Sequence, residues 1–206
     1  MPRSSQSIGH LAENGIPARL VLAILESAGI LYATLSPVIV TGLAQSEAFS
    51  RAEAGYVFSC NMLGTALGGL AIIFFIHRLD WRRASVLLLI ALVLLDLATA
   101  FASTPIALYL LRFMHGLIGG VLIGVIMSVI ARTINPERTI ALFIMLQLVT
   151  GGTLTLLLTP LLTSFGTAII WGSLAVFTLL ALLLLPLLGP YPVVDRGSDR
   201  TSAIAG

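Results

Sequence analysis

The run LLRFMHGLIGG, residues 110–120, places a single arginine, Arg112, inside a long apolar stretch. This stretch extends from Pro105 to Ala131, which is longer than the about 20 residues that a helix needs to cross ~30 Å of hydrocarbon. A charge at the centre of such a helix costs roughly 2.5–3.5 kcal/mol on insertion scales, so arginines kept there face a bundle interior or a wet cavity and have a partner. The run therefore predicts a membrane helix within a bundle, and it makes Arg112 the first candidate functional residue.

The composition of the whole chain indicates the same class of protein. Of its 206 residues, 58% are hydrophobic and 10% are charged, whereas soluble domains carry about 25% charged residues. We therefore expect an all-α polytopic membrane protein that is embedded in a lipid bilayer. The single cysteine, Cys60, excludes an internal disulfide and a multi-cysteine metal site. The arginines lie in short loops rather than on one basic face, so nucleic-acid binding has no support, and we expect neither a metal nor a cofactor.

Apolar length and helix-start signals predict six transmembrane helices. Ser50 and Glu53 have the spacing of a capping box, and Asp80 can cap the helix that follows it. Thr104 and Asn135 each precede a proline, which suits the first position of a helix. We expect a cytoplasmic segment over residues 1–17, a membrane domain over 18–190 and a polar, disordered cytoplasmic tail over 191–206. The predicted helices span residues 18–43, 52–76, 82–102, 105–131, 136–162 and 167–189.

The distribution of arginine predicts the orientation of the chain in the membrane. With the N-terminus inside, Arg51 is the only loop arginine on the outer side, as the positive-inside rule requires. Both termini are therefore predicted to be cytoplasmic, in a plasma or inner membrane. The arginines that this orientation places on the cytoplasmic side are Arg3, Arg19, Arg78, Arg82, Arg83, Arg132, Arg138, Arg196 and Arg200.

Small residues and prolines mark where the helices can approach closely or bend. Glycines at four-residue spacing favour tight helix packing, and they can also form a surface on which helices slide or rock. Pro37 and Pro160 lie inside predicted helices, which they should bend or loosen, either as simple kinks or as hinges in helices that line a cavity. The spaced glycines are Gly64, Gly68, Gly116, Gly120 and Gly124.

Two acids compete as the partner of Arg112. Glu26 and Arg112 each lie ~11–12 Å from their own membrane face at ~1.5 Å per residue, so their depths differ by ~7 Å in a core of ~30 Å, which a long arginine can largely span. Asp96 precedes position 104 by as many residues as Arg112 follows it, so these two match in depth. An ion pair between Asp96 and Arg112 would be structural and would need no function.

Glu26 and His115 each have a functional and a structural interpretation. A glutamate whose charge is opposed by burial and favoured by a nearby arginine can take up and release a proton during transport. It can equally be a protonated, hydrogen-bonded acid between helices. His115 lies one turn beyond Arg112, where it can relay a proton, bind substrate or simply pack.

These residues together resemble the N-terminal half of a major facilitator superfamily transporter. Arg112 to Gly116, followed by small residues, is similar to the R-x-x-x-G motif of the family's fourth helix, with His115 at a position that usually holds glutamine. Residues 77–83 resemble the family's basic loop, and Glu26 resembles the helix-1 acid of its proton-coupled drug antiporters. The loop residues that carry this second likeness are Arg78, Asp80, Arg82 and Arg83.

The resemblance implies a half bundle made of a 3+3 inverted repeat. By this likeness, helices 18–43 and 105–131 should line the transport path, and helices 52–76 and 136–162 should meet the other half. Helices 82–102 and 167–189 should then support the bundle from outside. Because the family fold needs two halves, we expect a second six-helix half or a homodimer as partner.

The leading hypothesis is a secondary transporter, or its N-terminal half, that moves a small solute by alternating access. Proton coupling would act through Glu26, Arg112 and His115. The alternative is a truncated or non-transporting membrane scaffold that needs a second half. An intramembrane enzyme is disfavoured, because the chain has no GxSxG or HExxH motif and no pair of intramembrane aspartates.

Overall fold

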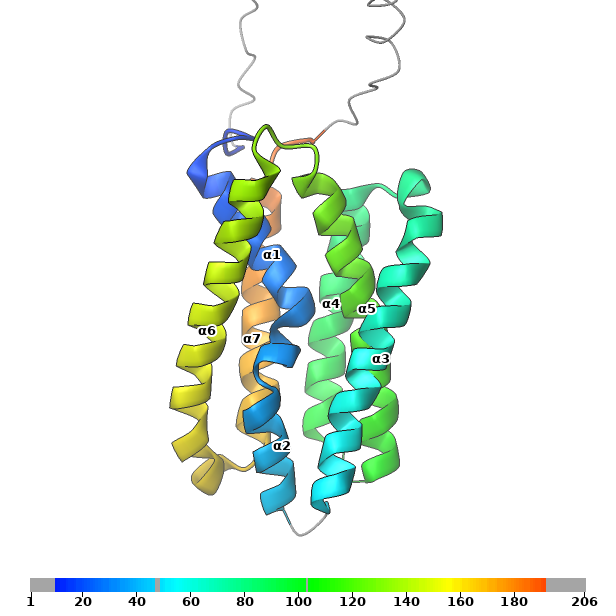
Figure 1. The fold of residues 1–206 in the computed structure, drawn as a ribbon, viewed down its shortest axis with the longest axis vertical. Coiled ribbons are helices and arrows are strands. Elements are labelled where there is room, and N and C mark those ends of the chain that lie inside the picture. The colour runs from blue at the N-terminus through cyan, green and yellow to red at the C-terminus, as the bar shows by residue number, and fades with distance from the viewer. Residues whose placement is uncertain (1–9, 47–48, 103, 192–206) are drawn as a thin grey trace, which may run out of the picture.

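The computed structural model describes residues 10–46, 49–102 and 104–191, and it folds them into one bundle of helices (Figure 1). Six of the helical stretches in these ranges are long and apolar enough to cross a membrane. The elements are α1 (Ile16–Thr34), α2 (Ser36–Gln45), α3 (Arg51–Phe75), η1 (Ile76–Arg78), α4 (Trp81–Ala100), α5 (Pro105–Ile130), α6 (Pro136–Phe165), α7 (Ala168–Leu184) and η2 (Leu185–Leu187).

The first membrane crossing is made of two helices, so the prediction of one continuous helix over 18–43 is wrong. α1 ends at Thr34, Leu35 leaves the helical conformation with φ −84° and ψ 2°, and α2 begins at Ser36. The physical reason is Pro37, which has no N–H to donate and whose ring collides with the carbonyl four residues earlier. Pro160 does not interrupt its helix, since α6 continues through it without a break.

Most of the predicted N-cap residues form the expected hydrogen bonds at the starts of their helices. The Ser50 N–H donates to Glu53 at 2.8 Å, and the Glu53 N–H donates to the Ser50 hydroxyl at 3.2 Å. Asp80 and Thr104 also cap their helices through their side chains. Asn135 makes no side-chain cap, contrary to expectation, so the proline after it defines that helix start alone.

The closest helix pair is α3 against α5, and glycines make the approach possible. A Cβ atom placed on Gly64 or Gly68 would come closer than 3.0 Å to the α5 backbone. A Cβ atom on Gly116 or Gly120 would come equally close to the α3 backbone. Gly124 faces the side chain of Ile72 instead. Backbone-to-backbone packing of this kind is how small residues stabilise helix pairs in membranes, where apolar faces gain little by leaving lipid.

The buried apolar side chains form two clusters along the bundle. Leu122 of α5 belongs to the cluster near the end of the bundle that carries both described chain ends. Leu108 of α5 belongs to the other cluster. Arg112 and His115 lie between these two positions on α5, and both are buried. The charged layer is therefore enclosed by apolar packing on each side.

The helices differ in how much of their surface the bundle covers. In α5, 50% of the membrane-length window is buried, but in α3 only 22% and in α6 only 11%. α3 and α6 lie at opposite edges of the bundle in Figure 1. These two helices therefore leave the largest uncovered apolar faces.

The chain segments next to α1 and α7 meet at one end of the bundle. The Leu11 N–H donates to the Leu187 carbonyl at 2.9 Å, and the Tyr191 hydroxyl donates to the Glu13 carbonyl at 2.9 Å. Arg132, after α5, donates to the Tyr191 carbonyl at 2.9 Å. Predictions for residues 1–9 and for the tail beyond Tyr191, including Arg3, Arg196 and Arg200, lie outside the described residues.

Candidate functional site

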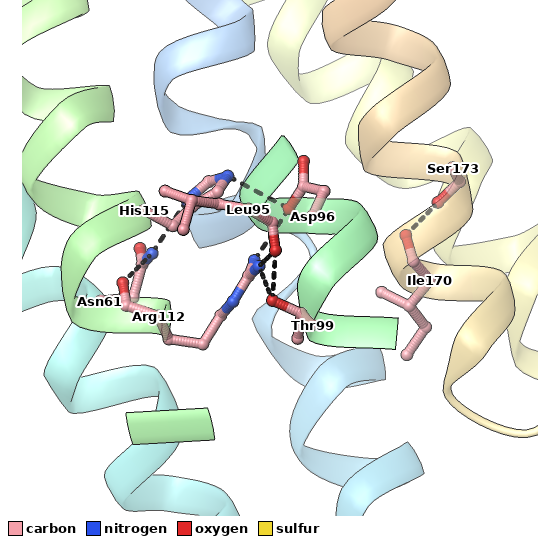
Figure 2. Close-up of polar contacts among 8 residues, drawn as sticks. All are labelled: Asn61, Leu95, Asp96, Thr99, Arg112, His115, Ile170 and Ser173. Atoms are coloured by element: carbon pink, nitrogen blue, oxygen red, sulfur yellow. Dashed lines mark hydrogen bonds and ion pairs between the residues drawn. The ribbon is translucent and has the colours of Figure 1, made fainter. Parts of the chain in front are cut away.

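The guanidinium of Arg112 is paired with Asp96 across the contact between α4 and α5 (Figure 2). Arg112 Nη1 lies 2.9 Å from Asp96 Oδ1, and neither side chain has any solvent exposure. Arg112 Nη2 donates to the Leu95 carbonyl at 3.1 Å and also to the Thr99 hydroxyl. Of the two acids that could pair with Arg112, the structure therefore pairs Asp96, and not Glu26, with it.

Two aromatic rings from other helices lie against the same guanidinium. Its central carbon is 4.9 Å from the ring centre of Trp171 on α7 and 5.5 Å from that of Tyr32 on α1. A cation over an aromatic face is attracted by the ring quadrupole, and the attraction is stronger when both groups are desolvated. Arg112 is thus held by side chains from α1, α4 and α7 in addition to its own helix.

His115 extends the cluster to α3. His115 Nε2 lies 3.3 Å from Asp96 Oδ1, and His115 Nδ1 lies 3.1 Å from the amide nitrogen of Asn61. The same Asn61 nitrogen donates to the Arg112 carbonyl at 2.9 Å. Asp96, Arg112, His115 and Asn61 therefore form one continuous polar network, which we call the Arg112 cluster.

Sequence reasoning missed one member of this cluster and three residues that contact Arg112. The residues that were not predicted are Asn61, Thr99, Trp171 and Tyr32. A signal for Asn61 was present, because a polar side chain within a membrane helix is usually placed against a hydrogen-bonding partner. Thr99 and Trp171 have no comparable signal, since each is ordinary in an apolar helix.

Glu26 is buried on α1 apart from this hydrogen-bonded network. Its side chain is 1% exposed, and neither carboxylate oxygen has a hydrogen-bond partner among the described residues. An ionised carboxylate in such a place is expensive unless it gains a proton, a partner or water. Of the two buried acids of the described membrane helices, Glu26 and Asp96, Glu26 is therefore the one whose charge has no compensating partner.

The predicted loop residues lie near one another but do not form a network of opposite charges. The Asp80 carboxylate accepts the N–H of Arg83 at 3.0 Å, and this hydrogen bond lowers the pKa of Asp80. Arg82 donates to the Pro186 carbonyl at 3.3 Å and lies over the Trp81 ring. Arg78 is exposed. Asp80 thus acts as the N-cap of α4, and Arg82 links the start of α4 to the segment after α7.

Within the described ranges, no group of three or more histidine, cysteine, aspartate or glutamate side chains is placed to hold a metal ion. What the Arg112 cluster offers chemically is a buried ion pair with an imidazole attached to it. Such a group can exchange protons and can change its internal hydrogen bonds when the helices around it move.

Comparison with known proteins gives one positive finding. The family model described as Major Facilitator Superfamily matches residues 22–204, a range that includes Glu26 and every residue of the Arg112 cluster. The chain matches none of the curated proteins with which it was compared.

Proposed function

The chain belongs to the major facilitator superfamily, whose members are membrane transporters of small solutes, and we propose that it forms a proton-coupled secondary transporter or the N-terminal half of one. The single observation that carries the proposal is the presence of both an uncompensated buried acid, Glu26, and a buried ion pair with an attached imidazole. Ionisable side chains inside membrane helices are expensive, and they mark ion and substrate pathways or proton relays.

Glu26 is the proposed proton carrier. Because its carboxyl group has no hydrogen-bond partner in the described residues, its protonation state depends on what enters its surroundings. α1 and α5 approach closely just beyond it, since a Cβ on Gly29 would come within 3.0 Å of the Ile123 side chain. A small movement of α1 along α5 would change the surroundings of Glu26. The binding or release of a proton at Glu26 is thereby coupled to the change of conformation.

The Arg112 cluster is proposed to keep the bundle in register during that movement. It joins α3, α4 and α5 by hydrogen bonds and α1 and α7 by ring contacts. Alternating access in the family's fold is largely rigid-body rocking around a fixed site. A half bundle whose helices contact one buried polar cluster is suited to move as a rigid unit.

The uncovered faces of α3 and α6 are the proposed contact surfaces for a second half. These helices have the lowest buried shares in the bundle, and α6 exposes polar residues such as Thr153 and Thr159. Hydroxyl groups that face a protein neighbour can form interhelical hydrogen bonds, which lipid chains cannot offer. The partner is a second six-helix half or a second copy of this chain.

The proposed location is the plasma or inner membrane with both termini in the cytoplasm. The described arginines at the terminal end of the bundle, among them Arg78, Arg83 and Arg138, support this orientation by the positive-inside rule.

The test is proton movement driven by solutes. The protein, purified from its own membranes with any chain that accompanies it, is reconstituted into vesicles that contain a pH-sensitive dye. A panel of cationic, anionic and neutral small solutes is then added. Wild-type protein should move protons with at least one solute, and Glu26→Gln should abolish this signal.

Glu137→Gln is the matched control, because Glu137 is exposed in the first turn of α6. It should leave proton movement unchanged. Proton movement that persists at the wild-type rate in both Glu26→Gln and Arg112→Ala, with folding intact, would refute the coupling assignment.

The alternative is a membrane scaffold that does not transport by itself. It is favoured by one observation, namely that Arg112 is fully buried and already engaged by Asp96, the Leu95 carbonyl and Thr99. A pair so enclosed can serve packing alone. The scaffold predicts no solute-dependent flux from this chain alone, and it predicts that substitutions of Glu26 and Arg112 are tolerated.

A further inference from the structure

The donors and acceptors around His115 determine which of its ring nitrogens carries the proton. Asn61 Nδ2 lies 2.9 Å from the Arg112 carbonyl oxygen, which can only accept a hydrogen bond. The opposite amide orientation would place the Asn61 oxygen against that carbonyl oxygen, and two acceptors would face each other. The nitrogen of the Asn61 amide must therefore be the atom at this position.

The same Asn61 nitrogen lies 3.1 Å from His115 Nδ1. Since an amide nitrogen only donates, His115 Nδ1 must be the acceptor and must carry no hydrogen. The imidazole hydrogen is then on Nε2, which lies 3.3 Å from the Asp96 carboxylate. The geometry gives a neutral His115 that accepts from α3 and donates to α4 (Figure 2).

We infer that Asn61 is a positioning residue for the proton of His115 and that it makes the Arg112 cluster a two-state element. A second proton on His115 must bind at Nδ1, where it would face the N–H groups of Asn61. The amide can accommodate it only by turning its oxygen toward the imidazole. That rotation breaks the hydrogen bond from Asn61 to the Arg112 carbonyl.

The broken bond lies at the closest helix contact of the bundle. Asn61 is one turn before Gly64, and a Cβ on Gly116 would come closer than 3.0 Å to the Asn61 carbonyl oxygen. The arrival of a proton at His115 therefore loosens the attachment of α3 to α5. The remaining titratable or charged groups around the imidazole are Asp96 from α4, Arg112 on α5 and Tyr32 from α1, whose ring centre is 5.9 Å away.

Only the consequence for transport rests on the proposed function. The tautomer itself is a property of the folded bundle and is measured without any flux. Failure of the transport proposal and failure of this inference are therefore distinguishable.

The experiment is ¹⁵N nuclear magnetic resonance of histidine-labelled protein in lipid nanodiscs. His10 and His77 are exposed, so a His10→Gln, His77→Gln background leaves the His115 ring as the only labelled imidazole. The spectrum should contain one nitrogen of the unprotonated type, assigned to Nδ1, and one of the protonated type, assigned to Nε2. A protonated Nδ1 at neutral pH in this background would overturn the inference.

Two substitutions of similar size test whether Asn61 controls the protonation of His115. If Asn61 had only a structural role, these substitutions would not change the ratio of doubly to singly protonated His115. Asn61→Leu removes the opposing donor, and Asn61→Asp replaces it with an acceptor for a hydrogen on Nδ1. At one mildly acidic pH, the ratio of doubly to singly protonated His115 should rise in the order wild type, Asn61→Leu, Asn61→Asp. Each step should be roughly threefold to tenfold, as expected for one hydrogen bond.

An equal ratio in wild type and Asn61→Asp, or the reverse order, would overturn the role of Asn61. If the Asp variant does not fold, the wild-type spectrum and the Leu variant still decide the question. The comparison of Asn61→Leu with wild type then has to show the rise in doubly protonated His115, and its absence refutes the inference.

Discussion

Replacement of Asp96 by leucine would leave the Arg112 charge buried with no acid beside it. The pair is fully enclosed, with Arg112 Nη1 and Asp96 Oδ1 at 2.9 Å and 0% exposure on both sides. Removing one partner of such a pair typically costs about 3–5 kcal/mol, because the remaining charge is uncompensated. The substitution also takes the acceptor from His115 Nε2. We therefore expect Asp96→Leu to lower the free energy of unfolding by about 3–5 kcal/mol.

Two companion variants separate the charge from the hydrogen bonds. Asp96→Asn keeps an oxygen that can accept from Arg112 and His115, so its loss should be smaller, about 1–3 kcal/mol. In the double variant Asp96→Leu, Arg112→Met, the uncompensated charge is gone, and replacement of buried ion pairs by apolar residues is often near neutral. The double variant should therefore lose less stability than Asp96→Leu alone, although His115 still lacks its acceptor.

Unfolding by a denaturing detergent, followed by the fluorescence of Trp171, measures these changes directly. Trp171 lies 4.9 Å from the guanidinium carbon, and Trp81→Phe leaves it as the only tryptophan. The reasoning would be refuted if Asp96→Leu lowered the free energy of unfolding by less than about 1 kcal/mol. A double variant whose loss equals the sum of the single losses would likewise refute it, because it would show no coupling between the two residues.

Further predictions address packing and the chain ends. Gly64→Ala places a methyl group against the α5 backbone and should lower the free energy of unfolding by about 1–3 kcal/mol. In contrast, Gly152→Ala meets no atom within 4 Å and should be neutral or raise stability by up to about 1 kcal/mol; equal losses in a thermal or detergent unfolding assay would contradict the assigned contact. Burial raises the pKa of Tyr191 from 10.0 to about 12, so its contribution to stability is complete below pH 10.0 and is lost as the pH rises toward about 12. Tyr191→Phe should remove this alkaline loss from the pH profile of unfolding, and an unchanged profile would show that Tyr191 is not its source.

The sequence predicted the membrane helices well, because the signals that define them are local. Apolar length and the scarcity of charge decide that a segment crosses the bilayer, and each of the six predicted segments corresponds to a helical crossing in the described residues. The Ser50 and Asp80 caps were predicted from spacing alone and are present. Asn135 does not cap, and the break at Leu35 divides a segment that was expected to be continuous. The sequence did single out Pro37 as a residue that should bend or loosen this segment.

The burial of Arg112, Glu26 and His115 was likewise readable in the sequence, since ionisable residues at membrane depth turn toward the protein interior. All three are buried. The close packing of the glycines on α3 and α5 was also expected from their spacing. These inferences needed only the position of each residue within its own helix.

The partners of these residues depended on which helices touch and at what register, and only the tertiary structure decided that. Asp96 and Glu26 were both within plausible reach of Arg112, but α4 packs on α5 at equal depth and brings Asp96 to 2.9 Å. Asn61 enters the cluster because glycines bring α3 close enough to α5 for a short side chain to reach the Arg112 carbonyl. A sequence determines the depth of a side chain through the length of one helix. Its neighbours are determined by packing between helices that are far apart in the chain.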